Sequence, residues 1–244
     1  MSVRCGSLKF GLFRRRKLSD IEKNLNSIFS EISLGNDRNE PIRLLGATKF
    51  VAAERVNEAI SCGLRFIGEN HAQEFRDKFA FYLPCEKHFI GTLQKNKLKY
   101  VVGKADVIDS VSSSDLAAAI DEKASALNVC QKVFIEVNAG DEETKTGASI
   151  TAAKALYKSI IELKHIKLTG VMTMLPAGKS EAETAELCEK VRAFYDEIRL
   201  KTQSVETLSM GMSGDYKIAI KHGSNMIRLG RAIFGEREIT TKNI

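Results

Sequence analysis

The chain has 244 residues, of which 43% are hydrophobic, a content that supports a large core and excludes general disorder. Its net charge of +6 equals the charge of the six basic residues that precede the first acidic residue, Asp20, so the remainder is electrically balanced. We therefore expect no nucleic acid as partner. No stretch approaches the roughly 18 apolar residues of a membrane span, so we expect no membrane partner either.

Residues 1–17 form a segment of their own. They are basic, contain no acidic residue and lack the apolar run of a signal peptide, so we predict a disordered arm, with an organelle transit sequence as the alternative. The five cysteines are odd in number and form no Cys-x-x-Cys pair. This argues against a disulfide framework and against a metal site, and it favours a reducing, cytoplasmic compartment.

From residue 18 onward the chain alternates short apolar runs with helix-length segments. Ser19 and Glu22 have the spacing of a capping box, and the apolar residues after them recur at helical spacing, which predicts a helix at 19–34. A later helix is expected to be capped by Ser112. Strands are predicted at 42–49, 64–68, 88–91, 106–111, 132–137, 166–173, 207–211 and 225–230, with helices between them.

This alternation predicts an α/β fold. Eight strands separated by helices, without a proline-rich or serine-rich linker, indicate a single (β/α)8 TIM barrel over residues 18–240. The additional N-terminal helix is expected to pack outside the barrel or over its N-terminal end. An open, doubly wound sheet is the alternative, because periodicity does not reveal closure.

In such barrels the functional residues lie where the strands end, at the C-terminal face. Lys49 ends the first predicted strand, and Asn70 follows the second. After the seventh strand, Met210-Gly-Met-Ser-Gly-Asp215 places two glycines and a hydroxyl before a helix, and Gly230-Arg231 follows the eighth strand. The loops after strands seven and eight are the habitual phosphate site of this fold, and free N–H groups at helix starts favour anions.

A lysine and a phosphate site in one barrel mouth suggest a phosphorylated aldehyde held as a Schiff base. Pyridoxal 5′-phosphate and the sugar phosphate of a Schiff-base aldolase both meet this description. Arg228, on the last strand just before the glycine turn, would reach a pyridine nitrogen, which favours pyridoxal phosphate. The aldolase is disfavoured further because the sixth strand ends in Met172-Thr-Met174 and carries no lysine there.

Several motifs, in order along the chain, resemble those of one family. They are Leu44-Leu-Gly-Ala-Thr-Lys49, Ile67-Gly-Glu-Asn-His-Ala-Gln-Glu74, His88-Phe-Ile-Gly-Thr-Leu-Gln-Lys-Asn-Lys97, Gly170-Val-Met-Thr173, Leu208-Ser-Met-Gly-Met-Ser213 and Ile227-Arg-Leu-Gly-Arg-Ala-Ile-Phe-Gly-Glu-Arg237. With these motifs the chain resembles the YggS/PROSC family of pyridoxal phosphate homeostasis proteins, over about residues 19–237. The resemblance implies the barrel of alanine racemase, of fold type III.

The resemblance also implies roles for individual residues. Lys49 would form the internal aldimine, Asn70 would lie beside the cofactor, and Arg228 would face the pyridine nitrogen. The phosphate would be bound by Ser213 together with the backbone N–H groups of Gly230 and Arg231.

Two further residues belong to the same family motifs. Met210, in the segment of Ser213, is counted among the cofactor-binding residues. Ser224 is interpreted as structural, because it precedes the last strand.

The chain departs from the family pattern in three places. Phe50 stands where the family usually has a proline, Lys87 where it has a tryptophan, and His71 where it has a tyrosine. These changes affect the helix starts and the side walls of the cofactor site, and they leave the lysine and phosphate contacts untouched.

The implied function is binding of pyridoxal phosphate and maintenance of its pool, with no catalytic residues. An arginine opposite the pyridine nitrogen weakens the cofactor as an electron sink, and racemisation needs a second acid or base, for which only His71 and Tyr216 are candidates. A low-activity racemase-like enzyme is the alternative. We expect a monomer, with pyridoxal-phosphate-dependent apoenzymes as candidate recipients of the cofactor.

Overall fold

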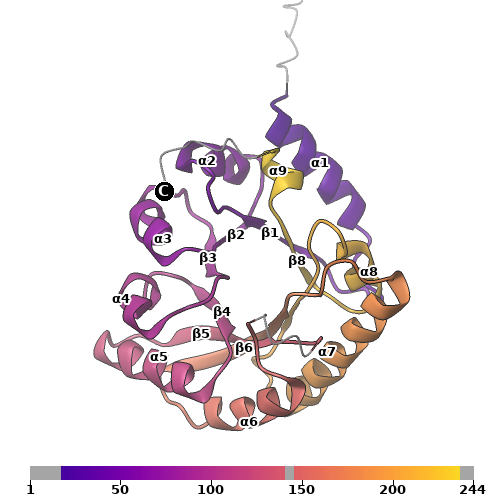
Figure 1. The fold of residues 1–244 in the computed structure, drawn as a ribbon. Coiled ribbons are helices and arrows are strands. Elements are labelled where there is room, and N and C mark those ends of the chain that lie inside the picture. The colour runs from indigo at the N-terminus through magenta and orange to yellow at the C-terminus, as the bar shows by residue number, and fades with distance from the viewer. Residues whose placement is uncertain (1–17, 141–145, 237–244) are drawn as a thin grey trace, which may run out of the picture.

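The computed structural model describes residues 18–140 and 146–236. Within these ranges eight parallel strands close into one barrel in chain order, with helices around it (Figure 1). The last strand pairs with the first, Leu44 opposite Ile227 and Leu45 opposite Arg228. The predicted (β/α)8 barrel is therefore confirmed and the open sheet is excluded, whereas the predicted arm at 1–17 lies outside the described residues.

The strands and helices follow the predicted alternation. The strands are β1 (Arg43–Ala47), β2 (Phe66–Glu69), β3 (Glu86–Phe89), β4 (Val107–Val111), β5 (Gln131–Val137), β6 (Ile166–Thr173), β7 (Thr207–Ser209) and β8 (Met226–Leu229). The helices are α1 (Asp20–Ile32), α2 (Ala53–Ser61), α3 (Ala72–Lys78), α4 (Leu98–Val101), α5 (Ser114–Ala126), α6 (Ile150–Ile160), α7 (Glu181–Lys201), α8 (Tyr216–Lys221) and α9 (Arg231–Phe234), with short 3₁₀ turns at Phe79–Phe81 and Lys95–Lys97.

The additional helix α1 packs outside the barrel, in the ring of helices beside α2 and α9 (Figure 1). Ser19 caps it by accepting a hydrogen bond from the backbone N–H of Glu22 at 3.1 Å, as the sequence predicts. Helices α8 and α9 have only six and four residues. The apolar face of α1 therefore supplies the cover of β1 and β8, with which it shares one hydrophobic cluster through Ile21, Leu25, Ile28 and Ile32.

One predicted cap is wrong. Helix α5 is capped by Ser113, whose Oγ accepts from the Leu116 N–H at 3.2 Å, and not by Ser112. The reason is reach, because an N-cap oxygen bonds the N–H two or three residues further on. With the helix beginning at Ser114, only Ser113 has the required spacing.

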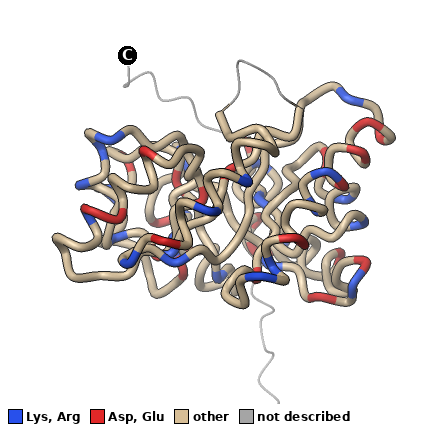
Figure 2. The backbone as a smooth tube through the Cα atoms, turned by 90° about the horizontal axis from the view of Figure 1, so that it is seen from below, with Lys and Arg blue, Asp and Glu red and all other residues tan. Residues whose placement is uncertain are grey.

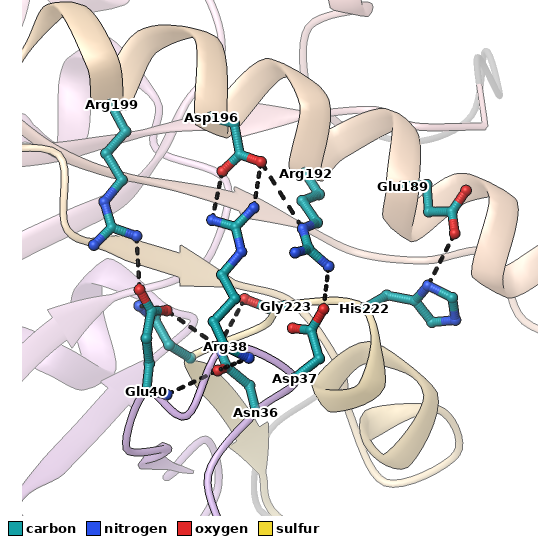
Figure 3. Close-up of polar contacts among 11 residues, drawn as sticks. Asn36, Asp37, Arg38, Glu40, Glu189, Arg192, Asp196, Arg199, His222 and Gly223 are labelled. Atoms are coloured by element: carbon teal, nitrogen blue, oxygen red, sulfur yellow. Dashed lines mark hydrogen bonds and ion pairs between the residues drawn. The ribbon is translucent and has the colours of Figure 1, made fainter.

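Ion pairs connect the loop after α1 to α7 (Figure 3). They lie at the face of the barrel opposite the C-terminal ends of the strands. Arg38 makes two hydrogen bonds to Asp196, Arg192 pairs with Asp37, and Arg199 Nη1 donates to Glu40 Oε1 at 2.7 Å. Single exposed pairs contribute little, about 0.2–1 kcal/mol each, but a paired network with bidentate geometry holds its partners in register. The network fixes the chain where it enters β1.

Acidic and basic residues are interspersed along the backbone when the molecule is viewed from below (Figure 2). Among the described residues, no helix is both long and apolar enough to cross a membrane. The expected absence of a nucleic-acid partner stays a prediction.

Candidate functional site

A cavity of about 590 Å³ lies at the C-terminal ends of the strands. Its walls come from the ends of β1 and β8, from the segments that follow β1, β2, β3, β6, β7 and β8, and from the first turns of α7 and α8. Six of the seven residues predicted from the sequence line it: Lys49, Asn70, Ser213, Arg228, Gly230 and Arg231. Residues from four separate strands thus meet at one site, as the barrel prediction requires.

Lys49 points into this cavity because side chains alternate along a strand. Leu45 is buried in the barrel interior and Ala47 lines the cavity, so Lys49 continues the inward-facing series. Its side chain is half-buried, and within the described ranges it makes no hydrogen bond and no ion pair. The amine is therefore available to a ligand.

Arg228 lies across the cavity on β8 and is buried. Its guanidinium donates to the backbone oxygen and the Oγ of Ser209, at 2.9 and 2.8 Å, and to the Thr173 oxygen at 2.7 Å. Burial lowers the pKa of Arg228, against the opposing effect of Asp109 and other carboxylates. Its hydrogen-bond acceptors are neutral and Arg228 lines the cavity, so its charge also acts on a ligand there.

The turn after β7 has the form of an anion cradle. Gly211 adopts φ 102°, and an added Cβ would lie 2.8 Å from the Cα of Tyr216, so the turn requires glycine. The N–H groups of Ser213 and Gly214 have no hydrogen-bond partner among the described residues, and the Ser213 side chain is exposed to the cavity mouth. These free donors suit a phosphate. The neighbouring carboxylate of Asp215 is occupied by the Met212 N–H at 2.5 Å.

Asn70 supplies an acceptor without a partner. Its Oδ1 is buried and forms no hydrogen bond among the described residues, although Asn70 lines the cavity. A buried orphan acceptor is costly unless a ligand satisfies it. A ligand with a hydroxyl group, such as pyridoxal phosphate, fits this requirement.

Met210 lies outside the cavity wall. Its side chain is fully buried in the outer hydrophobic core, and its backbone N–H donates to Met226 O at 3.1 Å. The backbone oxygen of Met210 accepts from Ser224 Oγ at 2.7 Å. Ser224 itself is buried, and among the described residues its hydroxyl bonds only backbone groups of the β7 and β8 segments, which is consistent with the structural role expected for it.

Neither candidate for a second acid or base faces the cavity. His71 is exposed and its ring packs against Phe50 at 5.2 Å between centroids. Tyr216 donates from its hydroxyl to Glu31 Oε2 at 2.9 Å, on the side of α1. Neither residue is part of the lining of the cavity that contains Lys49.

One wall of the cavity was not predicted from the sequence. The loop after β6, from Met174 to Lys179, lines it together with Glu181 and Thr184 of α7. Pro176 and Gly178 interrupt the apolar run after β6 and signal a turn. The sequence does not show that this turn lines the cavity, because its position depends on how the barrel closes.

The barrel interior contains an ionic cluster on β3 and β4, in which His88 and Asp109 are buried and Glu86 is partly exposed. His88 Nδ1 lies 2.8 Å from Asp109 Oδ1, and its Nε2 lies 3.1 Å from Glu86 Oε1. Burial alone would lower the pKa of His88, but the two carboxylates outweigh it and raise the pKa to about 9. We therefore expect His88 to be an imidazolium at neutral pH.

We predict that nitrogen NMR finds both ring nitrogens of His88 protonated at pH 7. Because the pKa is higher in the folded state, the stabilisation by this group is complete below the unfolded value of about 6.5 and is lost as the pH rises through 9. The free energy of unfolding should fall over this window by up to about 3 kcal/mol, measured by denaturant titration. A neutral His88 at pH 7 would contradict the assignment.

The fold and the site together define a class of protein. A closed parallel barrel with a lysine, a buried arginine and glycine turns at its mouth corresponds to the family described as alanine racemase, N-terminal domain, which matches residues 43–238. The chain is also 40% identical, over 199 residues, to the pyridoxal phosphate homeostasis protein of Aquifex aeolicus, covering 80% of this chain and 87% of that one. The chain belongs to the family of pyridoxal phosphate homeostasis proteins.

Two further comparisons agree. The pyridoxal phosphate homeostasis protein of Escherichia coli strain K12 is 32% identical, with 92% of this chain and 100% of that protein covered. The structure of PipY from Synechococcus elongatus with PLP bound superposes with a TM-score of 0.78 at 30% identity, covering 88% of this chain and 100% of that chain. The resemblance stated from the motifs is thereby confirmed.

Proposed function

We propose that the chain binds pyridoxal 5′-phosphate in the cavity, captures it covalently through Lys49, and acts in cytoplasmic homeostasis of this cofactor. The observation that carries the proposal is the convergence of Lys49, Asn70, Arg228 and the Ser213 turn on one cavity. The names of the relatives and the PLP-bound structure of PipY support it.

Each group has a defined task. When bound, pyridoxal phosphate supplies an aldehyde that a neutral amine attacks. Lys49 provides that amine, and the N–H groups of Ser213 and Gly214, with Gly230 and Arg231 beside them, provide donors for the phosphate. The Oδ1 of Asn70 accepts from the ligand's hydroxyl, and Arg228 faces the pyridine nitrogen.

The same residues favour a holder of the cofactor over an enzyme. The buried positive charge of Arg228 opposes protonation of the pyridine nitrogen, and an unprotonated pyridine withdraws electrons weakly. His71 and Tyr216 do not line the cavity and contact Phe50 and Glu31, so we assign no second acid or base. We propose a monomer that passes the cofactor to apoenzymes.

A low-activity racemase-like enzyme is the second candidate. It is favoured only by the family relation to alanine racemase. Exchange of the Cα proton of amino acids for deuterium, followed by NMR, separates the two, because a holder shows no exchange above that of free pyridoxal phosphate. Rapid exchange would establish the enzyme.

The test of cofactor binding is a titration of the purified protein with pyridoxal phosphate and, in parallel, with pyridoxal. We expect a new visible absorption band with both, and an affinity at least about tenfold weaker for pyridoxal, because it lacks the group that the Ser213 turn binds. A protein that remains colourless with pyridoxal phosphate would overturn the proposal. Equal affinities would overturn the phosphate assignment.

A further inference from the structure

The loop that carries Lys49 is held from outside the barrel at three residues, Thr48, Phe50 and Val51. Thr48 Oγ1 donates to Glu69 Oε1 at 2.7 Å. The Phe50 N–H donates to Glu74 Oε1 at 2.7 Å, and the Val51 oxygen accepts from Lys78 Nζ at 2.7 Å. Lys49 itself, between the first two of these anchors, faces the cavity on the other side.

The side chains that hold the loop are connected to one another. Lys78 also forms an ion pair with Glu74 and lies 4.0 Å from Glu69 Oε1, and the Tyr82 hydroxyl donates to the same Glu69 oxygen at 2.9 Å. We call these four residues, Glu69, Glu74, Lys78 and Tyr82, the outer clasp. It joins β2 and α3 to the loop after β1.

Glu69 is the centre of the outer clasp. Its side chain is 1% exposed, and its second oxygen, Oε2, is buried without a hydrogen-bond partner among the described residues. A carboxyl group in such a place is costly to bury unless its contacts compensate. Its contacts lead to Thr48, the residue that immediately precedes Lys49.

The loop adopts a conformation that needs such support. Phe50 has φ 61°, a left-handed conformation in a residue other than glycine. Its side chain is 56% exposed and contacts the exposed His71 ring, so burial in the core does not impose this conformation. Strained backbone persists where the surroundings determine it, and here the Phe50 N–H is bonded to Glu74.

We propose that Glu69 is a positioning residue. Through Thr48 it holds the loop so that the Lys49 amine points at the ligand's aldehyde. The charged carboxylate of Glu69 holds the loop more firmly than the neutral acid does. Hydrogen bonds from Thr48 and Tyr82 are stronger to a charged acceptor, and Lys78 is attracted only by the charge. The inference rests on the proposed capture of pyridoxal phosphate by Lys49.

The geometry predicts a pH dependence. Burial, with Glu74 next, raises the pKa of Glu69 to about 7, against the lowering effects of Thr48, Lys78 and Tyr82. Below that pH the Glu69 carboxyl group is protonated and uncharged, so the outer clasp holds the loop less firmly. Covalent capture should therefore become faster as the pH rises through 7. This increase adds to the increase in rate that any amine shows as it loses its proton.

The experiment compares Glu69→Gln with the unaltered protein between pH 6 and 8.5, following the rate of covalent capture by stopped-flow absorbance. We expect capture by Glu69→Gln to be about tenfold slower at pH 8 and to lack the inflection near 7, since small misplacements of a reacting group cost such factors. Affinity for pyridoxamine 5′-phosphate, which has no aldehyde, should not change. Glu122→Gln, exposed on α5, serves as the matched control.

The outcomes separate the two levels of the proposal. If the unaltered protein binds neither ligand, the proposed function fails. If it captures pyridoxal phosphate but Glu69→Gln gives the same rate and pH profile, the positioning role of Glu69 is wrong. Should Glu69→Gln not fold, Tyr82→Phe is the second variant, because it removes one hydrogen-bond donor to the Glu69 carboxylate. The inflection in its rate of capture against pH is expected to move to higher pH. An unmoved inflection overturns the inference.

Discussion

Replacement of Lys49 by arginine is expected to abolish covalent capture of pyridoxal phosphate completely. Arginine keeps the positive charge in the cavity, but its guanidinium stays protonated and does not attack a carbonyl. The measurement is mass spectrometry of protein reduced with borohydride after incubation with the cofactor. The unaltered protein should carry one adduct on the peptide that contains Lys49, and the variant none.

Lys190→Arg is the matched control for this variant, because Lys190 is exposed on α7 and pairs only with Glu186 among the described residues. It should keep the full adduct. Reversible binding should persist in Lys49→Ala, since Arg228 and the Ser213 turn remain. An adduct fixed on another lysine of the Lys49 variants would refute the assignment of Lys49 as the site of capture.

The residues on regular strands were predictable from the sequence because strand geometry leaves little choice. Side chains alternate, so an inward-facing Leu45 determines an inward-facing Lys49. The same rule explains the neighbours Glu69 and Asn70 at the end of β2. They share a strand end but face opposite sides, one towards the outer clasp and one into the cavity.

The structure was needed to place the other residues discussed for the site. Met210 comes directly after Ser209, which bonds Arg228 inside the barrel, so Met210 turns outward into the core. The directions of His71 and Tyr216 depend on turns, whose geometry periodicity does not determine. The loop after β6 reaches the cavity only because the barrel is closed.

Gly91→Ala is expected to destabilise the protein by about 3 kcal/mol or more and to weaken cofactor binding. An added Cβ would lie 1.9 Å from the backbone oxygen of Asn70, 2.6 Å from its carbonyl carbon and 2.7 Å from its Cα. All three are backbone atoms, so no change of rotamer relieves the overlap. The end of β2 must move, and Asn70 moves with it out of the cavity wall. Denaturant unfolding measures the stability.

Gly214→Ala is the matched control for stability, because nothing lies within 4 Å of its added Cβ and its φ is ordinary. It should change the free energy of unfolding by less than about 0.5 kcal/mol. A Gly91→Ala variant as stable as Gly214→Ala would show that the strand ends at β2 and β3 are compliant. Compliant strand ends would not hold the Asn70 oxygen in place for a ligand. The same result would therefore also contradict the assignment of Asn70 as a cofactor-binding residue.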